Sequence, residues 1–127
     1  MAKEKAADDA EKQDKPQHIF ATEKVHKVVH ATIQAFKIGK LSRQIRFDFP
    51  DLQTVLGKLW EEVEECKEAW ATEDKKALAE ELSDVYFSLA QVCRFLELDP
   101  ESVAMQGNRK FLGRFQKVYE LSAKRGL

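Results

Sequence analysis

The chain has 127 residues, 43% of them hydrophobic, and its 21 basic and 22 acidic residues leave a net charge of −1. This length, without an internal repeat, predicts one domain with a real core. Acids and bases are interspersed, no apolar run reaches membrane-spanning length and no signal peptide is visible, so nucleic-acid binding and membrane insertion are not indicated and a cytoplasmic protein is expected.

Residues 1–17 are rich in Lys, Glu, Asp and Ala and contain almost nothing large and apolar. This composition predicts a disordered N-terminal tail, with the folded domain in residues 18–127. From 18 to 44 the pattern becomes helical, and Gly39 is expected to be a weak point in that helix. His26 and His30 have a spacing that can hold zinc, but no third ligand lies nearby, so surface or packing histidines are the simpler interpretation.

The segment Phe47-Asp-Phe-Pro-Asp51 separates this helix from the next. Pro50 suits the first helical position and Asp51 suits the first turn. Two helices are then predicted from apolar stripes with alternating spacings of four and three. The stripes are Leu52, Leu56, Leu59, Val63, Cys66, Trp70 and Leu78, Leu82, Val85, Leu89, Val92, Leu96.

The chain is expected to reverse between these helices, with Thr72 as a possible N-cap and Glu73 and Asp74 in the first turn. An antiparallel hairpin follows, and its register can be derived from the sequence, because facing residues have numbers with a constant sum. Val63 then faces Leu82. By nearly the same rule Glu65 is level with Glu81, and Glu62 is level with Asp84.

These four acids lie on matching flanks of the two stripes, at about 100° of rotation per residue, so the hairpin gathers four carboxylates in one groove. Such a group resists full ionisation unless a cation sits among them. Oxygen-only ligands suit Mg²⁺, or Mn²⁺ in its place. Glu-Glu-x-x-Glu alone more often marks a solvated face, but the matched second pair favours a metal site.

The second helix of the hairpin, to about residue 98, is apolar around more than one face, so other helices or a partner subunit are expected to cover it, with Phe87 toward the partner. Arg94 and Glu97 are expected to contact solvent. Cys66 and Cys93 lie roughly 20 Å apart in this register and are predicted to be free thiols.

The last part of the chain begins with a clear helix start, Asp99 as the cap and Pro100 at the first position. Gly107 and Asn108 are expected to interrupt the helix, and Asn108 is a possible cap for a final one. That helix carries an apolar stripe, Phe111, Phe115, Val118 and Leu121, and a basic side, Lys110, Arg114 and Lys117. An all-α fold of four to five helices around a central antiparallel hairpin is therefore predicted.

Several motifs together resemble one family. Lys58-Leu-Trp-Glu-Glu-Val-Glu-Glu65 and Glu81-Leu-Ser-Asp84 are similar to the paired acidic signature of the MazG nucleoside triphosphate pyrophosphohydrolases, members of the all-α NTP pyrophosphatases. Ile45-Arg-Phe-Asp-Phe-Pro-Asp51, Asp99-Pro-Glu101 and Asn108-Arg-Lys-Phe-Leu-Gly-Arg-Phe115 extend the resemblance in the family's order.

The resemblance implies Mg²⁺-dependent hydrolysis of nucleoside triphosphates to the monophosphate and pyrophosphate, in nucleotide-pool house-cleaning, by a homodimer or higher homo-oligomer whose helices form a bundle. Glu62, Glu65, Glu81 and Asp84 would hold the metal. Lys58, placed one turn before Glu62, either meets a phosphate or pairs with that acid. Lys110 and Arg114 match positions at which relatives hold the triphosphate, and Asn108 matches a companion position. A basic helix face is usually solvent-facing, so a solvated face is the alternative.

Glu65 or Glu61 is the expected general base, although Glu61 lies opposite the stripe and would enter the groove only from a second subunit. Phe47 and Phe49 either fill the core or stack on the nucleobase. Two other functions compete with this one. A ferritin-type redox bundle lacks its Glu-x-x-His motif. A non-catalytic dimeric module that binds nucleotides or a protein is the alternative, which the intact set of acids disfavours.

Overall fold

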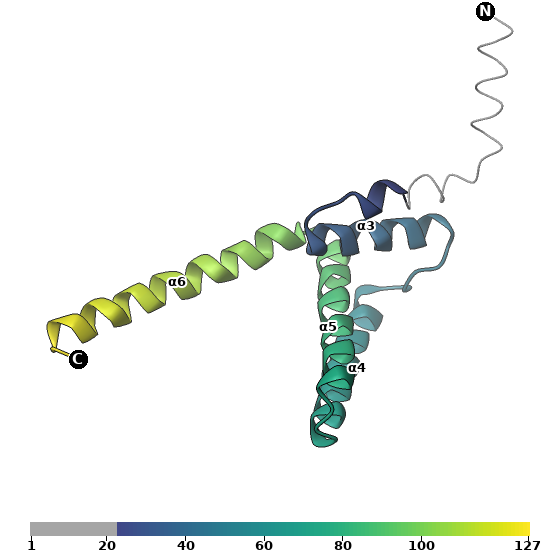
Figure 1. Ribbon diagram of the computed structural model, residues 1–127. Helices are drawn as coiled ribbons and strands as arrows, with labels where there is room; N and C mark the ends of the chain where they lie inside the picture. Colours follow the sequence, from purple (N-terminus) through teal and green to yellow (C-terminus); the bar gives the residue numbers. More distant parts are fainter. Residues whose placement is uncertain (1–22) are drawn as a thin grey trace, which may run out of the picture.

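The computed structural model describes residues 23–127, and the predicted tail at 1–17 lies outside them. The described chain is helical, with no strand, in the order α3 (Ala31–Gln44), α4 (Leu52–Ala71), α5 (Lys75–Phe95) and α6 (Pro100–Lys124). The all-α prediction is confirmed. Helices α4 and α5 form an upright hairpin, α3 crosses one end of it, and α6 leads away from that corner (Figure 1).

The single helix predicted from 18 to 44 is wrong within the described residues. A short helical turn at 23–26 is followed by non-helical backbone, and α3 starts only at Ala31. The break contains the adjacent β-branched residues Val28 and Val29, which restrict helix formation. Gly39 lies inside α3 and is buried, so it is a packing position instead of a weak point.

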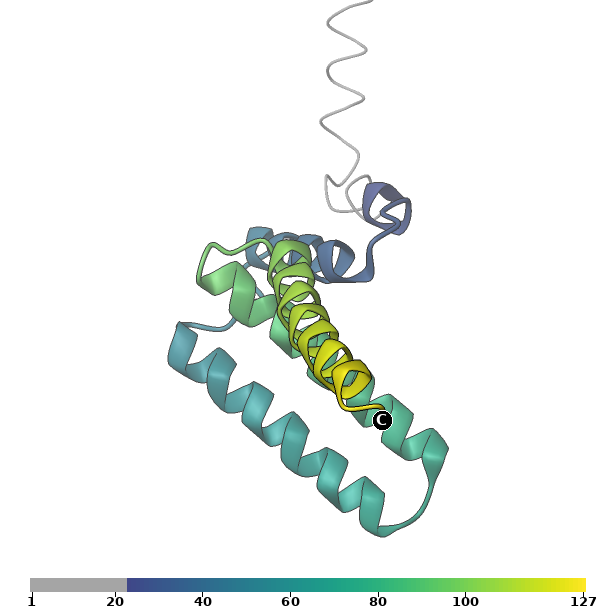
Figure 2. The same ribbon diagram turned by 90° about the vertical axis from the view of Figure 1, so that its left-hand side faces the viewer.

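The two helices of the hairpin run antiparallel side by side (Figure 2), and their contact is the most extensive between the described elements. Asp51 is the N-cap of α4, accepting a hydrogen bond from the Thr54 backbone N–H at 2.8 Å, so Pro50 precedes the helix and does not open it. The reversal lies where predicted, but Asp74 caps α5, accepting from the N–H groups of Lys76 and Ala77, while Thr72 ends α4.

Burial along α4 and α5 follows the predicted stripes only in part. Val55 and Glu62 are buried on α4, and Ser88, Ala90 and Gln91 are buried on α5. Large stripe residues remain partly exposed, among them Leu56, Val63, Leu82, Leu89 and Leu96. Other stripe residues, Leu59, Cys66, Leu78, Val85 and Val92, are half-buried, and the acidic flank of α4 is buried at Glu62.

Arg94 is a second correction on α5. It was expected in solvent, but its guanidinium is buried and forms a bidentate ion pair with Asp48, Nη2 to Oδ1 at 2.7 Å and Nη1 to Oδ2 at 2.9 Å. Its Nε donates to Gln91, whose amide donates in turn to the carbonyl of Ala35 in α3. This network joins α3, α5 and the segment before α4.

Helix α6 is continuous, so the predicted interruption at Gly107 and Asn108 is wrong. A glycine costs about 1 kcal/mol in a helix interior, which a helix of 25 residues tolerates. Its predicted start is confirmed in position, with Asp99 at the N-cap and Pro100 in the first turn, but the Asp99 side chain forms no capping hydrogen bond.

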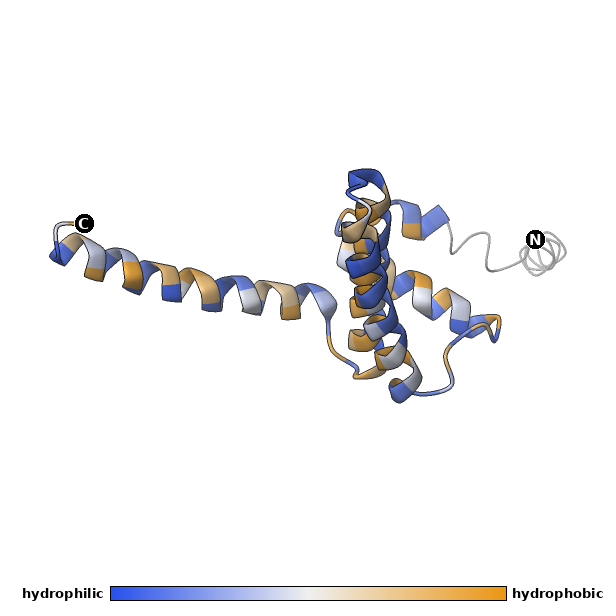
Figure 3. Cartoon of the chain, turned by 90° about the horizontal axis from the view of Figure 1, so that it is seen from below, coloured by the Kyte–Doolittle hydropathy of each residue, from blue (hydrophilic) through white to orange (hydrophobic). Residues whose placement is uncertain are grey.

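Among the described helices α6 contacts α3 and α5, and near its beginning the Thr32 hydroxyl donates to Glu101. Beyond that corner the helix stands free, with apolar residues along it (Figure 3). Phe111, Phe115, Val118 and Tyr119 are each at least 64% exposed.

Cys66 and Cys93 are free thiols, as predicted. None of the helices between residues 23 and 127 is both long and apolar enough to cross a bilayer.

Candidate functional site

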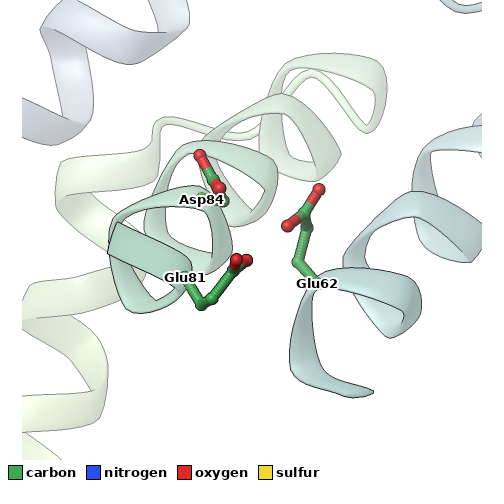
Figure 4. A group of neighbouring side chains, drawn as sticks. All are labelled: Glu62, Glu81 and Asp84. Carbon is green, nitrogen blue, oxygen red and sulfur yellow. The ribbon is translucent and has the colours of Figure 1, made fainter. Parts of the chain in front are cut away.

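Three carboxylates converge across the hairpin. Glu62 extends from α4, and Glu81 and Asp84 extend from α5 toward it (Figure 4). Each offers an oxygen, and these three oxygens lie within 4.8 Å of one another. Glu81 and Asp84 share a helix face because they are three residues apart, and the reversal at 72–74 brings Glu62 opposite them. The register derived from the sequence thus correctly brings these acids together.

Two of the oxygens in this acidic cluster are buried without a partner. Glu62 is only 5% exposed, and its Oε2 has no hydrogen-bond partner within the described chain. The Oε2 of Glu81 is also buried and also has no hydrogen-bond partner within the described chain. A buried carboxylate oxygen without a donor is costly, and a cation bound between the helices would remove that cost. Three oxygen donors and no nitrogen or sulfur suit a hard divalent cation.

Glu65, the fourth predicted ligand, lies beside the cluster but outside the set of oxygens that converge. The neighbouring Glu81 and Glu62 carboxylates raise the pKa of Glu65 to about 7, because only its protonated form can donate a hydrogen bond to them. Without a cation, the group of acids therefore retains a proton near neutral pH. Such retention is the expected response of clustered carboxylates.

Lys58 supplies the positive charge nearest to the cluster. Its ammonium lies 2.9 Å from a Glu62 oxygen and 3.6 Å from one of Glu61. The hydrogen bond from Lys58 holds the pKa of Glu62 below its usual value. Of the two roles left open for Lys58, pairing with Glu62 is the one seen in this structure. Glu61 has a side chain 60% exposed, so it lies outside the groove of its own hairpin.

A small pocket of about 160 Å³ adjoins the acidic cluster. Its lining includes Glu62, Asp84 and Lys58 together with Phe49 and Phe87. Phe47, by contrast, is 77% exposed. Of the two phenylalanines considered for contact with a nucleobase, the structure therefore places Phe49 next to the acids and Phe47 away from them.

Several residues near this pocket were missed by sequence reasoning. Ser88 and Gln91 also line it, and the partly buried pair of Asp48 and Arg94 holds the segment that carries Phe49. The Phe49 backbone N–H also donates to Asp48 Oδ1 at 2.8 Å. A polar residue in an otherwise apolar stretch of α5 was the available signal for both Gln91 and Arg94.

The predicted triphosphate contacts are not assembled with the acids. Asn108, Lys110 and Arg114 all lie on the exposed part of α6. The Arg114 guanidinium lies over the Phe111 ring, 5.3 Å from its centroid. Within one chain, the basic helix and the acidic cluster are therefore separate features.

Comparison with known proteins shows which family shares these acidic motifs. Residues 51–119, which contain both acidic motifs, match the model of the MazG nucleotide pyrophosphohydrolase domain. The chain is 40% identical over 103 residues to the nucleoside triphosphate pyrophosphohydrolase/pyrophosphatase MazG of Thermotoga maritima, covering 81% of this chain and 39% of that protein. It is 32% identical over 119 residues to the nucleoside triphosphate pyrophosphohydrolase of Escherichia coli K12, covering 92% of this chain and 45% of that protein.

The chain thus spans less than half the length of these curated relatives. The matched region nevertheless covers more than half of the chain and includes the whole hairpin that carries the acids. On this evidence the chain belongs to the MazG nucleotide pyrophosphohydrolase family.

Proposed function

We propose that this protein hydrolyses nucleoside triphosphates to the nucleoside monophosphate and pyrophosphate with the help of Mg²⁺, for which Mn²⁺ can substitute, as part of nucleotide-pool house-cleaning. The observation that carries the proposal is the acidic cluster, with its converging oxygens on Glu62, Glu81 and Asp84 and the partnerless buried oxygens of the two glutamates. Membership of the MazG family supports the same reaction.

In this proposal Glu62, Glu65, Glu81 and Asp84 hold the metal. Bound Mg²⁺ supplies neutralisation of the triphosphate charge and acidification of the attacking water. Water attacks the α-phosphorus, and the bond between that phosphorus and the bridging oxygen to the β-phosphate breaks, so pyrophosphate leaves. Lys58 lies beside Glu62, so its ammonium would also donate a hydrogen bond to a phosphate oxygen once a substrate is bound.

Glu65 is the proposed general base. Glu65 stands within hydrogen-bond reach of Glu62 and Glu81, so its carboxylate is placed to take a proton from a water held at the acidic cluster. Glu61 is the second candidate, and its exposed side chain would serve a site completed by a second subunit. Phe49, on the wall of the adjoining pocket, is the proposed contact for the nucleobase.

A homodimer or higher homo-oligomer is part of the proposal. Helix α6 exposes Phe111, Phe115 and Tyr119, and the hairpin exposes a second apolar strip that includes Leu56, Leu82 and Leu89. Covering both surfaces by a second copy of the chain would remove them from water. Asn108, Lys110 and Arg114 would then reach the triphosphate from the partner's side of the interface.

The test is release of pyrophosphate from a panel of common and modified nucleoside triphosphates, with and without Mg²⁺. The variants are Glu62→Gln and Asp84→Asn, and the matched control is Glu64→Gln, a partly exposed neighbour on α4. Because metal-assisted stabilisation is worth several kcal/mol, each cluster variant is expected to lose activity by about 100-fold or more while keeping its helical circular dichroism. Undiminished turnover in Asp84→Asn would refute the assignment.

A further inference from the structure

A larger cavity lies away from the acidic cluster, between α3 and the corner where α5 leads into α6. Its volume is about 610 Å³, within the range of small-molecule sites. None of its lining residues belongs to the acidic cluster or to the small pocket beside it. Arg94 lines the cavity, whereas Gln91, to which Arg94 Nε donates, lines the small pocket.

One wall of this corner cavity is cationic. Lys37, Lys40 and Arg43 follow at intervals of three along α3 and all line the cavity. None of them has a carboxylate within 4 Å in the part of the chain that the structure describes, where the ion pairs use Lys58, Lys67 and Arg94. The Lys40 ammonium lies 5.2 Å from the Phe36 ring centroid, a contact that orients its charge without neutralising it.

The opposite wall is acidic and apolar. It carries Glu97 and Asp99, in the connection between α5 and α6, with Phe95 and Leu98 beside them. These acids do not pair with the α3 cations across the cavity. Arg94 is also in the lining, but Asp48 already neutralises it. The cavity therefore keeps opposite charges apart around an open volume, which a ligand with both an anionic end and hydrogen-bond donors would bridge.

We infer that the corner cavity is a second ligand site, distinct from the proposed catalytic cluster, and that it takes a nucleotide. The phosphate lies against Lys37, Lys40 and Arg43, where charge-assisted hydrogen bonds are strongest. The nucleobase ring lies against Phe95 and the neighbouring apolar side chains. Sugar hydroxyl or exocyclic amino groups donate to Glu97 and Asp99. No metal is required, because the wall itself supplies the positive charge.

The experiment is calorimetric titration of the full chain with AMP in EDTA, which removes any metal-dependent binding at the acidic cluster. Saturable binding is expected. The double variant Lys37→Glu/Lys40→Glu is expected to weaken it by about tenfold or more, as the loss of charged hydrogen bonds predicts. Lys37→Gln/Lys40→Gln removes the charges without reversing them and guards against a folding defect. Lys67→Glu, an exposed lysine on α4, is the control and is expected to bind normally.

Two further arms identify the source of any binding. Asp84→Asn is expected to bind AMP in EDTA as the unaltered protein does, even if it has lost pyrophosphate release, so failure of the catalytic proposal and failure of this one are distinguishable. Adenosine and inorganic phosphate are each expected to bind more weakly than AMP. Absence of AMP binding, equal affinity in the lysine variants, loss of binding in Asp84→Asn, or equal binding of adenosine or phosphate would overturn the inference.

Discussion

The fold places the carboxylate of Glu81 where its negative charge is unfavourable. Its Oε2 is buried without a hydrogen-bond partner in the described chain, and the carboxylates of Glu62 and Asp84 are within a few ångströms. Without a cation, Glu81→Gln is expected to stabilise the protein, because an amide removes one negative charge and donates to its neighbours. The expected gain is about 1 kcal/mol, or roughly 3–5 °C in Tm for a domain of this size. Thermal unfolding in EDTA measures it.

With added Mg²⁺, the unaltered protein is expected to become more stable than Glu81→Gln. A ligand that binds only the folded state stabilises it by about 2.7 kcal/mol at 100 times its Kd, and Glu81→Gln is expected to forfeit most of that gain. Glu80→Gln, one residue earlier and exposed, is the matched control and is expected to follow the unaltered protein in both conditions. An identical rise in Tm with Mg²⁺ in both the Glu81 variant and the unaltered protein would contradict a metal at this cluster.

At the scale of elements, the position of α3 on α5 depends on Gly39. A Cβ at this residue would overlap Gln91 Oε1 and Arg94 Nε, both of which are engaged in hydrogen bonds. Gly39→Ala is therefore expected to destabilise the fold by about 1–3 kcal/mol through overpacking, despite the better helix propensity of alanine. Urea unfolding measures the difference.

Gly57 supplies the comparison for that substitution. It lies within α4, and an added Cβ there meets nothing within 4 Å. Gly57→Ala is expected to stabilise the protein by about 0.5–1 kcal/mol, since only the helix propensity changes. If both alanine variants were equally stable, the close approach of α3 to Gln91 and Arg94 would not exist in solution.

The ion pair of Asp48 and Arg94 fixes the segment before α4, and its contribution depends on pH. The hydrogen bonds from Arg94 hold the pKa of Asp48 below its usual value of 3.8. A depressed folded-state pKa means that the stabilisation is fully present above about pH 4 and is lost as pH falls through the folded pKa. Asp48→Asn is therefore expected to cost roughly 3–5 kcal/mol at neutral pH, with the difference shrinking below pH 4.

Urea unfolding of both proteins across pH 2–7 tests this dependence. Glu68→Gln, an exposed acid on α4, is the control and is expected to change stability by less than about 0.5 kcal/mol at any pH. A difference between Asp48→Asn and the unaltered protein that stayed constant down to pH 2 would show that the pair does not act through ionisation of Asp48.

These elements also show which features a sequence can predict. The start of α6 at Asp99 and Pro100 and the reversal near Thr72 were predicted correctly, because each depends on residues adjacent in the chain. The convergence of Glu62 with Glu81 and Asp84 was also predictable, since helix periodicity and one turn determine the register.

The features that were missed depend on contacts between distant segments. Asp48 and Arg94 are 46 residues apart, and no local pattern indicates that the segment before α4 returns to the end of α5. The burial of polar residues on α5 has the same origin. Leu82 and Leu89 of the predicted stripe are exposed, yet Ser88 and Gln91 are buried, and Gln91 donates to Ala35 of α3, a helix that also packs on α5.

For the whole molecule, the decisive feature is that α6, which carries Lys110 and Arg114, leads away from the hairpin that carries the acids (Figure 1). An isolated helix of this kind, with Phe111 and Phe115 each 65% exposed, gains stability only by packing on something else. If a second copy provides that surface, the proposed site combines the hairpin of one chain with Lys110 and Arg114 of the other.

Mixing two inactive variants tests this arrangement. Asp84→Asn damages the acidic cluster and Arg114→Ala damages the basic helix, and each alone is expected to lose pyrophosphate release. If α6 acts across the interface, a mixed dimer contains one site with an intact cluster and an intact helix, so co-refolding at equal amounts is expected to restore about a quarter of the activity. Phe115→Asp, which places a charge on the apolar face of α6, is expected to yield monomers by light scattering and to abolish the restoration. Recovery no greater than the sum of the separate variants would mean that each helix serves its own chain.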